Sequence, residues 1–148
     1  MAAERRILAI DYGSVRVGLA LSDPMGIIAS GYGTLANDAS LMQRLRGITE
    51  EQHVVRIVIG MPLTLRGEHG EAAAMVDKFV EQLREALAID VVTLDERFTS
   101  SIAERTIREM GVGKKKRRDK GKVDELAAAV LLQDYLNSGA HLRPVPGG

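Results

Sequence analysis

The order of short apolar segments constrains the fold of this chain more than any other feature of its sequence. Residues 6–11 and 17–23 predict two strands, and the short, glycine-containing connection 12–16 between them is typical of a hairpin. Residues 27–35 predict a third strand after the turn signal of residues 23–26. The chain is therefore expected to begin with a hairpin and a third strand.

The middle of the chain alternates helices with strands. Asn37 or Asp38 would cap a first helix, and buried strands are predicted at 54–59 and 89–94. The apolar face of the first helix consists of Leu41, Met42, Leu45 and Ile48. The apolar face of a second helix, after the loop 60–70, consists of Ala72, Met75, Val76, Phe79, Val80, Leu83 and Leu87.

Two more helices are expected towards the C-terminus. Ser101 and Glu104 have capping-box spacing, which predicts a helix through about Met110. The last helix should end near residues 137–139 and bury Val123, Leu126, Ala127, Val130 and Leu131. The whole order predicts an α/β fold in one domain, residues 1–148, with a mixed five-stranded sheet, helices on both faces and a flexible tail from about residue 138.

Composition sets limits on the class of protein. The chain has 148 residues, of which 45% are hydrophobic and 27% charged, as in a soluble globular domain. No apolar run reaches the roughly 18 residues of a membrane span, so no membrane partner is expected. The absence of cysteine excludes disulfides and thiolate metal sites, and a cytoplasmic location is the expectation.

Carboxylates stand at the ends of three apolar segments that are far apart in the sequence. Asp11 ends the first strand, Asp95 and Glu96 follow the fifth, and Asp124 opens the last helix. Sites in open α/β sheets form outside the carboxyl ends of the strands, so we expect these acids to converge. Hard oxygen ligands suit Mg²⁺ or Mn²⁺, and a pair of such ions would activate water and stabilise the leaving oxygen of a phosphodiester.

Each carboxylate also has a purely structural interpretation. Asp11 would start a turn, and Asp95 would pair with Arg97 or cap the backbone. Glu96 would be an exposed loop acid, and Asp124 would favour the positive end of its helix dipole. Their joint placement at the ends of elements favours a metal site over four separate roles.

Basic residues are concentrated in one run although the net charge is zero. Residues 114–122 hold seven basic residues and one acid, which is typical of a solvated loop. The functional alternative is an arm that contacts phosphates, and it gains weight because the run directly precedes Asp124. The predicted nucleic-acid-binding residues are Arg16, Arg97, Lys114, Lys115, Lys116, Arg117, Arg118, Lys120 and Lys122.

Aromatic residues make up only 3% of the chain, which bears on the kind of nucleic acid it would recognise. So few rings offer few platforms for stacking splayed bases. We therefore expect recognition of backbone shape, in structured RNA or branched DNA, rather than of single-strand sequence.

Several blocks of the chain resemble the YqgF family, also called RuvX, from about Ile7 to Leu136. The matching blocks are residues 9–14, 16–18, 22–24, 60–63, 95–99, 123–124 and 127–128. The resemblance implies an RNase H-like three-layer fold, related to that of the Holliday-junction resolvase RuvC. Carried over by position, it implies Asp11, Glu96 and Asp124 as the catalytic, metal-binding acids, with Asp95 as an alternate or outer ligand.

The resemblance also implies a function and a setting. It implies a cytoplasmic nuclease that matures the 5′ end of the small-subunit ribosomal RNA precursor, and resolution of recombination junctions has been proposed for the same family. A junction resolvase needs two active sites and hence a homodimer, whereas an RNA-trimming enzyme would work as a monomer.

Two other functions stay open at this point. Residues 11–14 also resemble the phosphate loop of actin-like ATPases and sugar kinases, but those proteins enclose their nucleotide between two such domains. A non-catalytic RNA-binding factor of ribosome assembly would keep the fold and use the basic run. The complete set of acids favours a nuclease over both.

Overall fold

The computed structural model describes residues 5–62, 70–95 and 120–139. The expected helix from Ser101 to Met110 lies outside these ranges, and so does the tail after residue 139. Among the described residues, no helix is long and apolar enough to cross a membrane.

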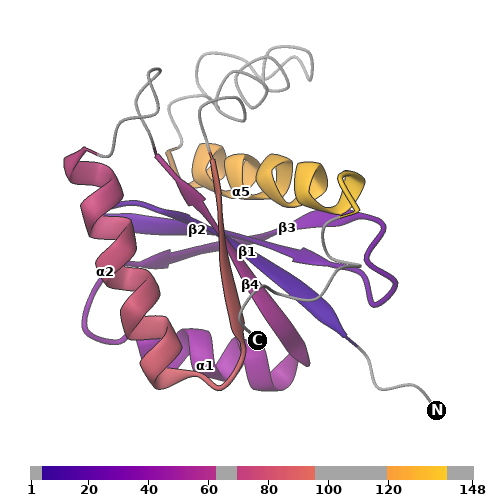
Figure 1. Cartoon of the computed structure of the whole chain (residues 1–148), viewed down its shortest axis with the longest axis horizontal. Helices are drawn as coiled ribbons and strands as arrows, with labels where there is room; N and C mark the ends of the chain where they lie inside the picture. The colour runs from indigo at the N-terminus through magenta and orange to yellow at the C-terminus, as the bar shows by residue number, and fades with distance from the viewer. Residues whose placement is uncertain (1–4, 63–69, 96–119, 140–148) are drawn as a thin grey trace.

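A five-stranded sheet in the order β3-β2-β1-β4-β5 forms the middle layer (Figure 1). Strands β1 (Arg6–Tyr12), β2 (Arg16–Ser22) and β3 (Ala29–Ala36) pair antiparallel. Strands β4 (Val54–Met61) and β5 (Asp90–Asp95) add to β1 in parallel. The mixed five-stranded sheet predicted from the sequence is therefore confirmed.

The connection between β1 and β2 is tight because of its glycine. A Cβ at Gly13 would overlap the backbone carbonyl oxygen of Arg16, so a larger residue would force the hairpin open. The amide of Asn37, beyond β3, donates to the Gly13 carbonyl at 2.7 Å. Asn37 thus fixes this turn and does not cap the helix that follows it.

Helices cover both faces of the sheet, as predicted. Helices α1 (Leu41–Glu51) and α2 (Glu71–Ala86) lie on one face, and α5 (Lys120–Asn137) lies on the other (Figure 1). The cap predicted at Asn37 or Asp38 is wrong, because α1 begins after Ser40. Asp38 instead accepts the Ser40 backbone N–H at 2.9 Å and its hydroxyl at 2.6 Å.

Strand β3 starts two residues later than predicted. The carboxylate of Asp23 accepts the backbone N–H groups of Ile27 and Ile28 at 2.7 and 2.8 Å, which removes both residues from the sheet ladder. These hydrogen bonds hold the pKa of Asp23 below its ordinary value, led by the bond from Ile28. The next residue, Ala29, donates to the Gln133 side chain on α5 at 2.9 Å.

The core has one cluster on each face of the sheet. The cluster under α1 and α2 includes Leu8, Ile10, Leu45 and Leu83. The cluster under α5 includes Ile7, Ala9, Ala20, Val58, Ala128, Leu131, Leu132, Tyr135 and Leu136.

The buried face predicted for the last helix is wrong in part. Of its five predicted core residues only Leu131 is fully buried, and the face that packs consists of Ala128, Leu131, Leu132, Tyr135 and Leu136. Residues 126–132 are all apolar, so their periodicity does not single out one face of the helix.

Candidate metal centre at the carboxyl end of the sheet

Asp11 lies near the carboxyl end of β1, on the face covered by α5. Side chains alternate along a strand, and Ile7 and Ala9 of β1 pack in the cluster under α5. Asp11 shares their face, is half-buried, and pairs across the antiparallel ladder with Gly18 of β2. The first predicted acid therefore faces the last helix.

Gly18 brings the backbone of α5 at Asp124 against the sheet. The prediction that Asp124 opens the last helix is wrong, because α5 begins at Lys120 and has no acid in its first turn. A Cβ at Gly18 would overlap the backbone carbonyl group of Asp124 and the amide nitrogen of Glu125. Only a glycine allows this close approach, which places Asp124 over the strand position opposite Asp11. The signal was present in the sequence, since an isolated glycine within a strand indicates close backbone contact.

Asp124 forms an ion pair with Arg16, the first residue of β2. The guanidinium nitrogen and the carboxylate oxygen lie 3.7 Å apart, and the two side chains are 33% and 29% exposed. The sequence predicts Arg16 as a phosphate-binding residue, and the structure brings it to one of the predicted metal-binding acids. Partial exposure leaves both side chains within reach of a bound molecule.

Asp95 belongs to the opposite face of the sheet by strand alternation. It pairs with Met61 of β4 and shares the parity of Val91, which packs under α1 and α2. Glu96 lies outside the described residues. Within the ranges that the structure describes, no three acidic or histidine side chains are grouped closely enough to hold a metal ion.

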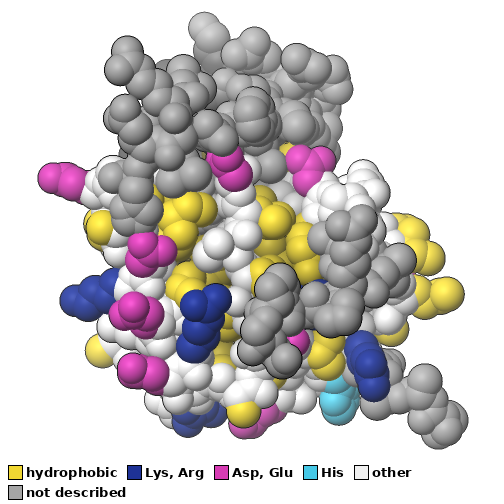
Figure 2. Space-filling view, viewed as in Figure 1, with side chains coloured by type: hydrophobic (Ala, Val, Ile, Leu, Met, Phe, Trp, Pro, Cys, Tyr) yellow, Lys and Arg dark blue, Asp and Glu magenta, His cyan; other side chains and the backbone are white. Residues whose placement is uncertain are grey.

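The predicted basic residues are described only in part. Lys120 begins α5, and the ammonium group of Lys122 lies 3.8 Å from the carboxylate of Glu125. Arg97 and residues 114–119 lie outside the described ranges. Figure 2 shows acidic side chains beside the grey atoms at the top of the view, where β5 ends.

A cavity on the opposite face of β1, under α1 and α2, is not predicted from the sequence. It has a volume of about 460 Å³ and lies between β1, the start of α1 and the second half of α2. Tyr12, next to Asp11, and Phe79 of α2 line it and stack with ring centroids 4.4 Å apart. Periodicity marks Phe79 only as a core residue, so nothing in the sequence pairs it with Tyr12.

The three-layer arrangement is that of an RNase H-like fold. Among solved structures, RuvC from T. thermophilus in complex with a Holliday junction substrate is similar, with a TM-score of 0.57 and 14% identity, covering 93% of this chain and 96% of that one. The resolvase of Fowlpox virus, in complex with Holliday junction DNA, has a TM-score of 0.52 and 12% identity, covering 90% of this chain and 97% of that one.

Sequence comparison is more specific than the fold. The family model described as "RuvX: Holliday junction resolvase" matches residues 5–138, and the chain belongs to this family. A relative from Salinibacter ruber is 45% identical over 93% of this chain and 96% of its own length. Another from Porphyromonas gingivalis is 44% identical over 90% and 96%. Both relatives carry the name "Putative pre-16S rRNA nuclease".

Proposed function

We propose that this chain is a metal-dependent nuclease that hydrolyses phosphodiester bonds, with Asp11, Glu96 and Asp124 as its metal-binding acids. Membership of the RuvX family and the resolvase-like fold support nuclease activity. Strands β1 and β5 both run parallel to β4, so the ends that carry Asp11 and Asp95 lie at the same edge of the sheet.

The observation that carries the proposal is the contact between Gly18 and the backbone of α5 at Asp124, one turn into the helix. Gly18 is the ladder partner of Asp11, and its missing side chain lets the Asp124 backbone approach the sheet. The backbone of Asp124 therefore lies over the strand position paired with Asp11, on the face of the sheet to which Asp11 belongs. No packing requirement of a hydrophobic core explains acids at that position.

The donor chemistry fits a hard divalent cation. Asp11 and Asp124 offer carboxylate oxygens that are half-buried and so positioned by the fold, and such oxygens prefer Mg²⁺ or Mn²⁺. When bound, the cation would polarise the phosphoryl oxygen and lower the pKa of water. Arg16 lies beside Asp124 and would donate hydrogen bonds to the phosphate group that the bound cation contacts.

Strand parity favours Glu96 over Asp95 as the third ligand. Leu94 packs against the cluster under α5, whereas Asp95 has the parity of the opposite face. Residues two apart share a face along a strand, so Asp95 lies on the face opposite Asp11 and is disfavoured as the direct ligand. This assignment agrees with the position implied by the family motif.

The substrate proposed is the 5′ end of the small-subunit ribosomal RNA precursor. The support is the name carried by relatives that are 44–45% identical over most of this chain. Arg97 and the basic residues Lys114, Lys115, Lys116, Arg117, Arg118, Lys120 and Lys122 would contact its backbone. We also propose a cytoplasmic location, with which the lack of cysteine is compatible.

A second candidate is resolution of branched DNA. It is favoured by the likeness in fold to two resolvases determined with junction DNA and by the description of the family. This activity would require a homodimer with two active sites, whereas rRNA trimming would not.

A cleavage panel separates the candidates. The parent chain is incubated with a structured RNA carrying the precursor 5′ end and with a four-way DNA junction, each with Mg²⁺ or Mn²⁺. We expect cleavage of the RNA, which Glu96→Gln abolishes and Asp95→Asn only reduces. Cleavage of the junction alone, by a dimer, would favour the second candidate. RNA binding without cleavage by any form would reject a nuclease.

A further inference from the structure

We propose that the cavity lined by Tyr12 and Phe79 is a binding pocket for one nucleobase, with preference for a base that carries an exocyclic amine. The proposal rests on the proposed nuclease function, because it assigns a position for a nucleotide close to the scissile phosphate. The volume of about 460 Å³ falls within the range of roughly 300–1,000 Å³ of small-molecule sites.

The aromatic pair provides a rigid stacking surface. Phe79 is 3% exposed and fixed in the core, whereas Tyr12 is half-buried and stacks on it at an interplanar angle of 30°. A ring held in this way needs little further ordering to stack on a base. These are two of only five aromatic residues in the chain, so the low aromatic content does not preclude a stacking site.

The rim of the cavity carries the polar groups that read base edges. Gln82 contributes an amide and Glu85 a carboxylate, whereas the Asn37 amide already donates to the Gly13 carbonyl and the Asp38 carboxylate already accepts from Ser40. Carboxylates accept hydrogen bonds from the amine of cytosine, and amides pair with the amine and ring nitrogen of adenine. Among the described residues, the lining holds two carboxylates and no lysine or arginine, which disfavours a phosphate. A base therefore fits this chemistry better than a nucleotide's backbone.

The position of Tyr12 connects the pocket to the proposed metal centre. Tyr12 follows Asp11 directly in β1, so the two side chains point to opposite faces near the same strand end. A nucleic-acid strand that crosses this end of β1 with one phosphate at Asp11 would have a neighbouring base within reach of the cavity beside Tyr12. The pocket would then hold one unpaired base while the acids and their cation act on the phosphate backbone of the nucleic acid.

Nuclear magnetic resonance titration with nucleoside monophosphates tests the pocket without metal or cleavage. We expect adenosine and cytidine 5′-monophosphates to shift backbone amides of residues 37–42 and 82–86, and uridine 5′-monophosphate to shift them less. Tyr12→Leu should weaken binding by about tenfold or more, since it removes one stacked base–aromatic contact. Tyr32→Leu, which changes an exposed tyrosine outside the cavity, should leave binding unchanged.

A second variant keeps the test informative if Tyr12→Leu fails to fold. Glu85→Gln should reduce the preference for adenosine and cytidine over uridine, and Glu81→Gln, on the same helix but outside the cavity, should not. The proposal is overturned if the amides of residues 37–42 and 82–86 do not shift, or if their shifts persist unchanged in Tyr12→Leu. Equal response to all three nucleotides would reject base recognition by the rim. Base binding by a chain that cleaves no nucleic acid would uphold the pocket and reject the nuclease.

Discussion

At the scale of single residues, the position of the last helix depends on Gly18 of β2, whose side chain is a single hydrogen atom. Gly18 has no side chain, and the backbone of Asp124 occupies the space that a Cβ would need. The same contact sets the height of Asp124 above β2 and β1. Stability and the geometry of the proposed metal centre are therefore linked at this glycine.

We expect Gly18→Ala to lower the free energy of unfolding by about 1–3 kcal/mol, because α5 must move away from the sheet. Gly47→Ala is the matched control. Gly47 lies within α1 with nothing near the position of its Cβ, so alanine should raise stability by about 0.5–1 kcal/mol. Urea denaturation measures both changes, and equal effects of the two substitutions would contradict the contact.

Asp23 makes one part of the stability depend on pH. Its pKa is lowered from 3.8 by backbone N–H groups, first that of Ile28, so the folded state favours the ionised form. This stabilisation is fully present above the unfolded value and is lost as the pH falls through the lower folded value. Asp23→Ala should therefore destabilise the chain at neutral pH, by about 1 kcal/mol, and less under acid conditions. The same loss at both pH values would reject an ionic contribution.

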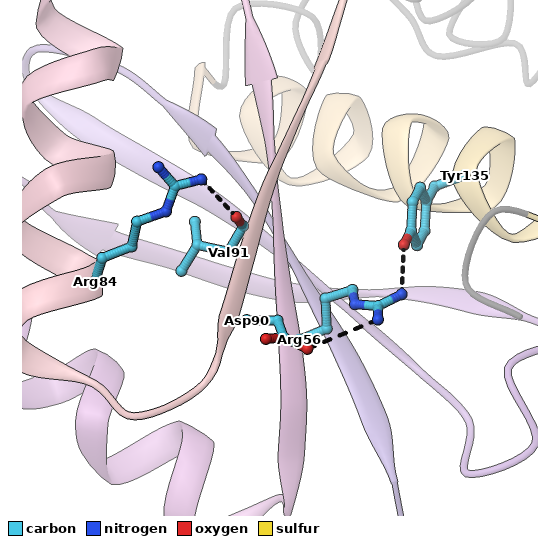
Figure 3. A network of polar contacts seen from close by, with 5 residues as sticks. All are labelled: Arg56, Arg84, Asp90, Val91 and Tyr135. Carbon is cyan, nitrogen blue, oxygen red and sulfur yellow. Dashed lines mark hydrogen bonds and ion pairs between the residues drawn. The ribbon is translucent and has the colours of Figure 1, made fainter. Parts of the chain in front are cut away.

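At the scale of elements, Arg56 joins two strands to the last helix (Figure 3). Its guanidinium donates to the Tyr135 hydroxyl on α5 at 2.9 Å and lies 3.7 Å from the carboxylate of Asp90 on β5. On the other side of β5, Arg84 of α2 donates to the Val91 carbonyl at 2.9 Å. Polar contacts thus bind α2 and α5 to the same edge of the sheet.

Tyr135→Phe should lower the free energy of unfolding by about 1–2 kcal/mol, because it leaves the half-buried Arg56 guanidinium without its hydroxyl acceptor. Tyr32→Phe removes a hydroxyl from an exposed tyrosine on β3 and serves as the control, with a change near zero. Thermal denaturation of the two variants gives the comparison. Equal melting temperatures would contradict a structural role for the hydrogen bond.

Elements were predictable from the sequence where local patterns determine them, and less so where distant contacts do. The alternation of apolar runs predicts the five strands, and the stripe of α2 predicts its buried residues Val76, Phe79, Val80 and Leu83. The stripe is wrong at the start of the helix, where Ala72 and Met75 are exposed and Ala73 is buried. The first residues of β3 were misassigned because Asp23 captures their N–H groups. The face of α5 was misassigned because its apolar residues surround the helix.

For the candidate site, the sequence predicts the acids but not the contacts that position them. The backbone of Asp124 lies against Gly18, the ladder partner of Asp11, although Asp124 is not at the start of the helix. The pairing of Arg16 with Asp124 depends on the hairpin register. Val91 and Leu94 pack on opposite faces of the sheet, so by strand alternation Asp95 lies on the face opposite Asp11. Glu96 as a ligand stays a prediction.

At the scale of the whole molecule, both core clusters include residues of the same sheet, one cluster on each face. Leu8 and Ala9, adjacent in β1, are each 0% exposed and belong to different clusters. Neither cluster can lose its packing without disturbing the strand that forms the other. We therefore propose that the chain folds as a single domain.

Leu8→Ala and Leu131→Ala test this unity from the two faces. Each should lower stability by about 2–5 kcal/mol, and each should shift one common transition seen by calorimetry and by circular dichroism. Two separate transitions, of which each variant moves only one, would contradict a single cooperative unit.

The central claim is that Asp11 and Asp124, from opposite ends of the chain, form one metal centre for hydrolysis. The most direct test is the rate of Mn²⁺-dependent cleavage of structured RNA by Asp11→Asn, with Glu51→Gln, an exposed acid at the end of α1, as the control. We expect Asp11→Asn to lower the cleavage rate about a thousandfold, because several kcal/mol of charge stabilisation are lost. Glu51→Gln should keep the parent rate. Cleavage by Asp11→Asn at the parent rate would contradict the claim.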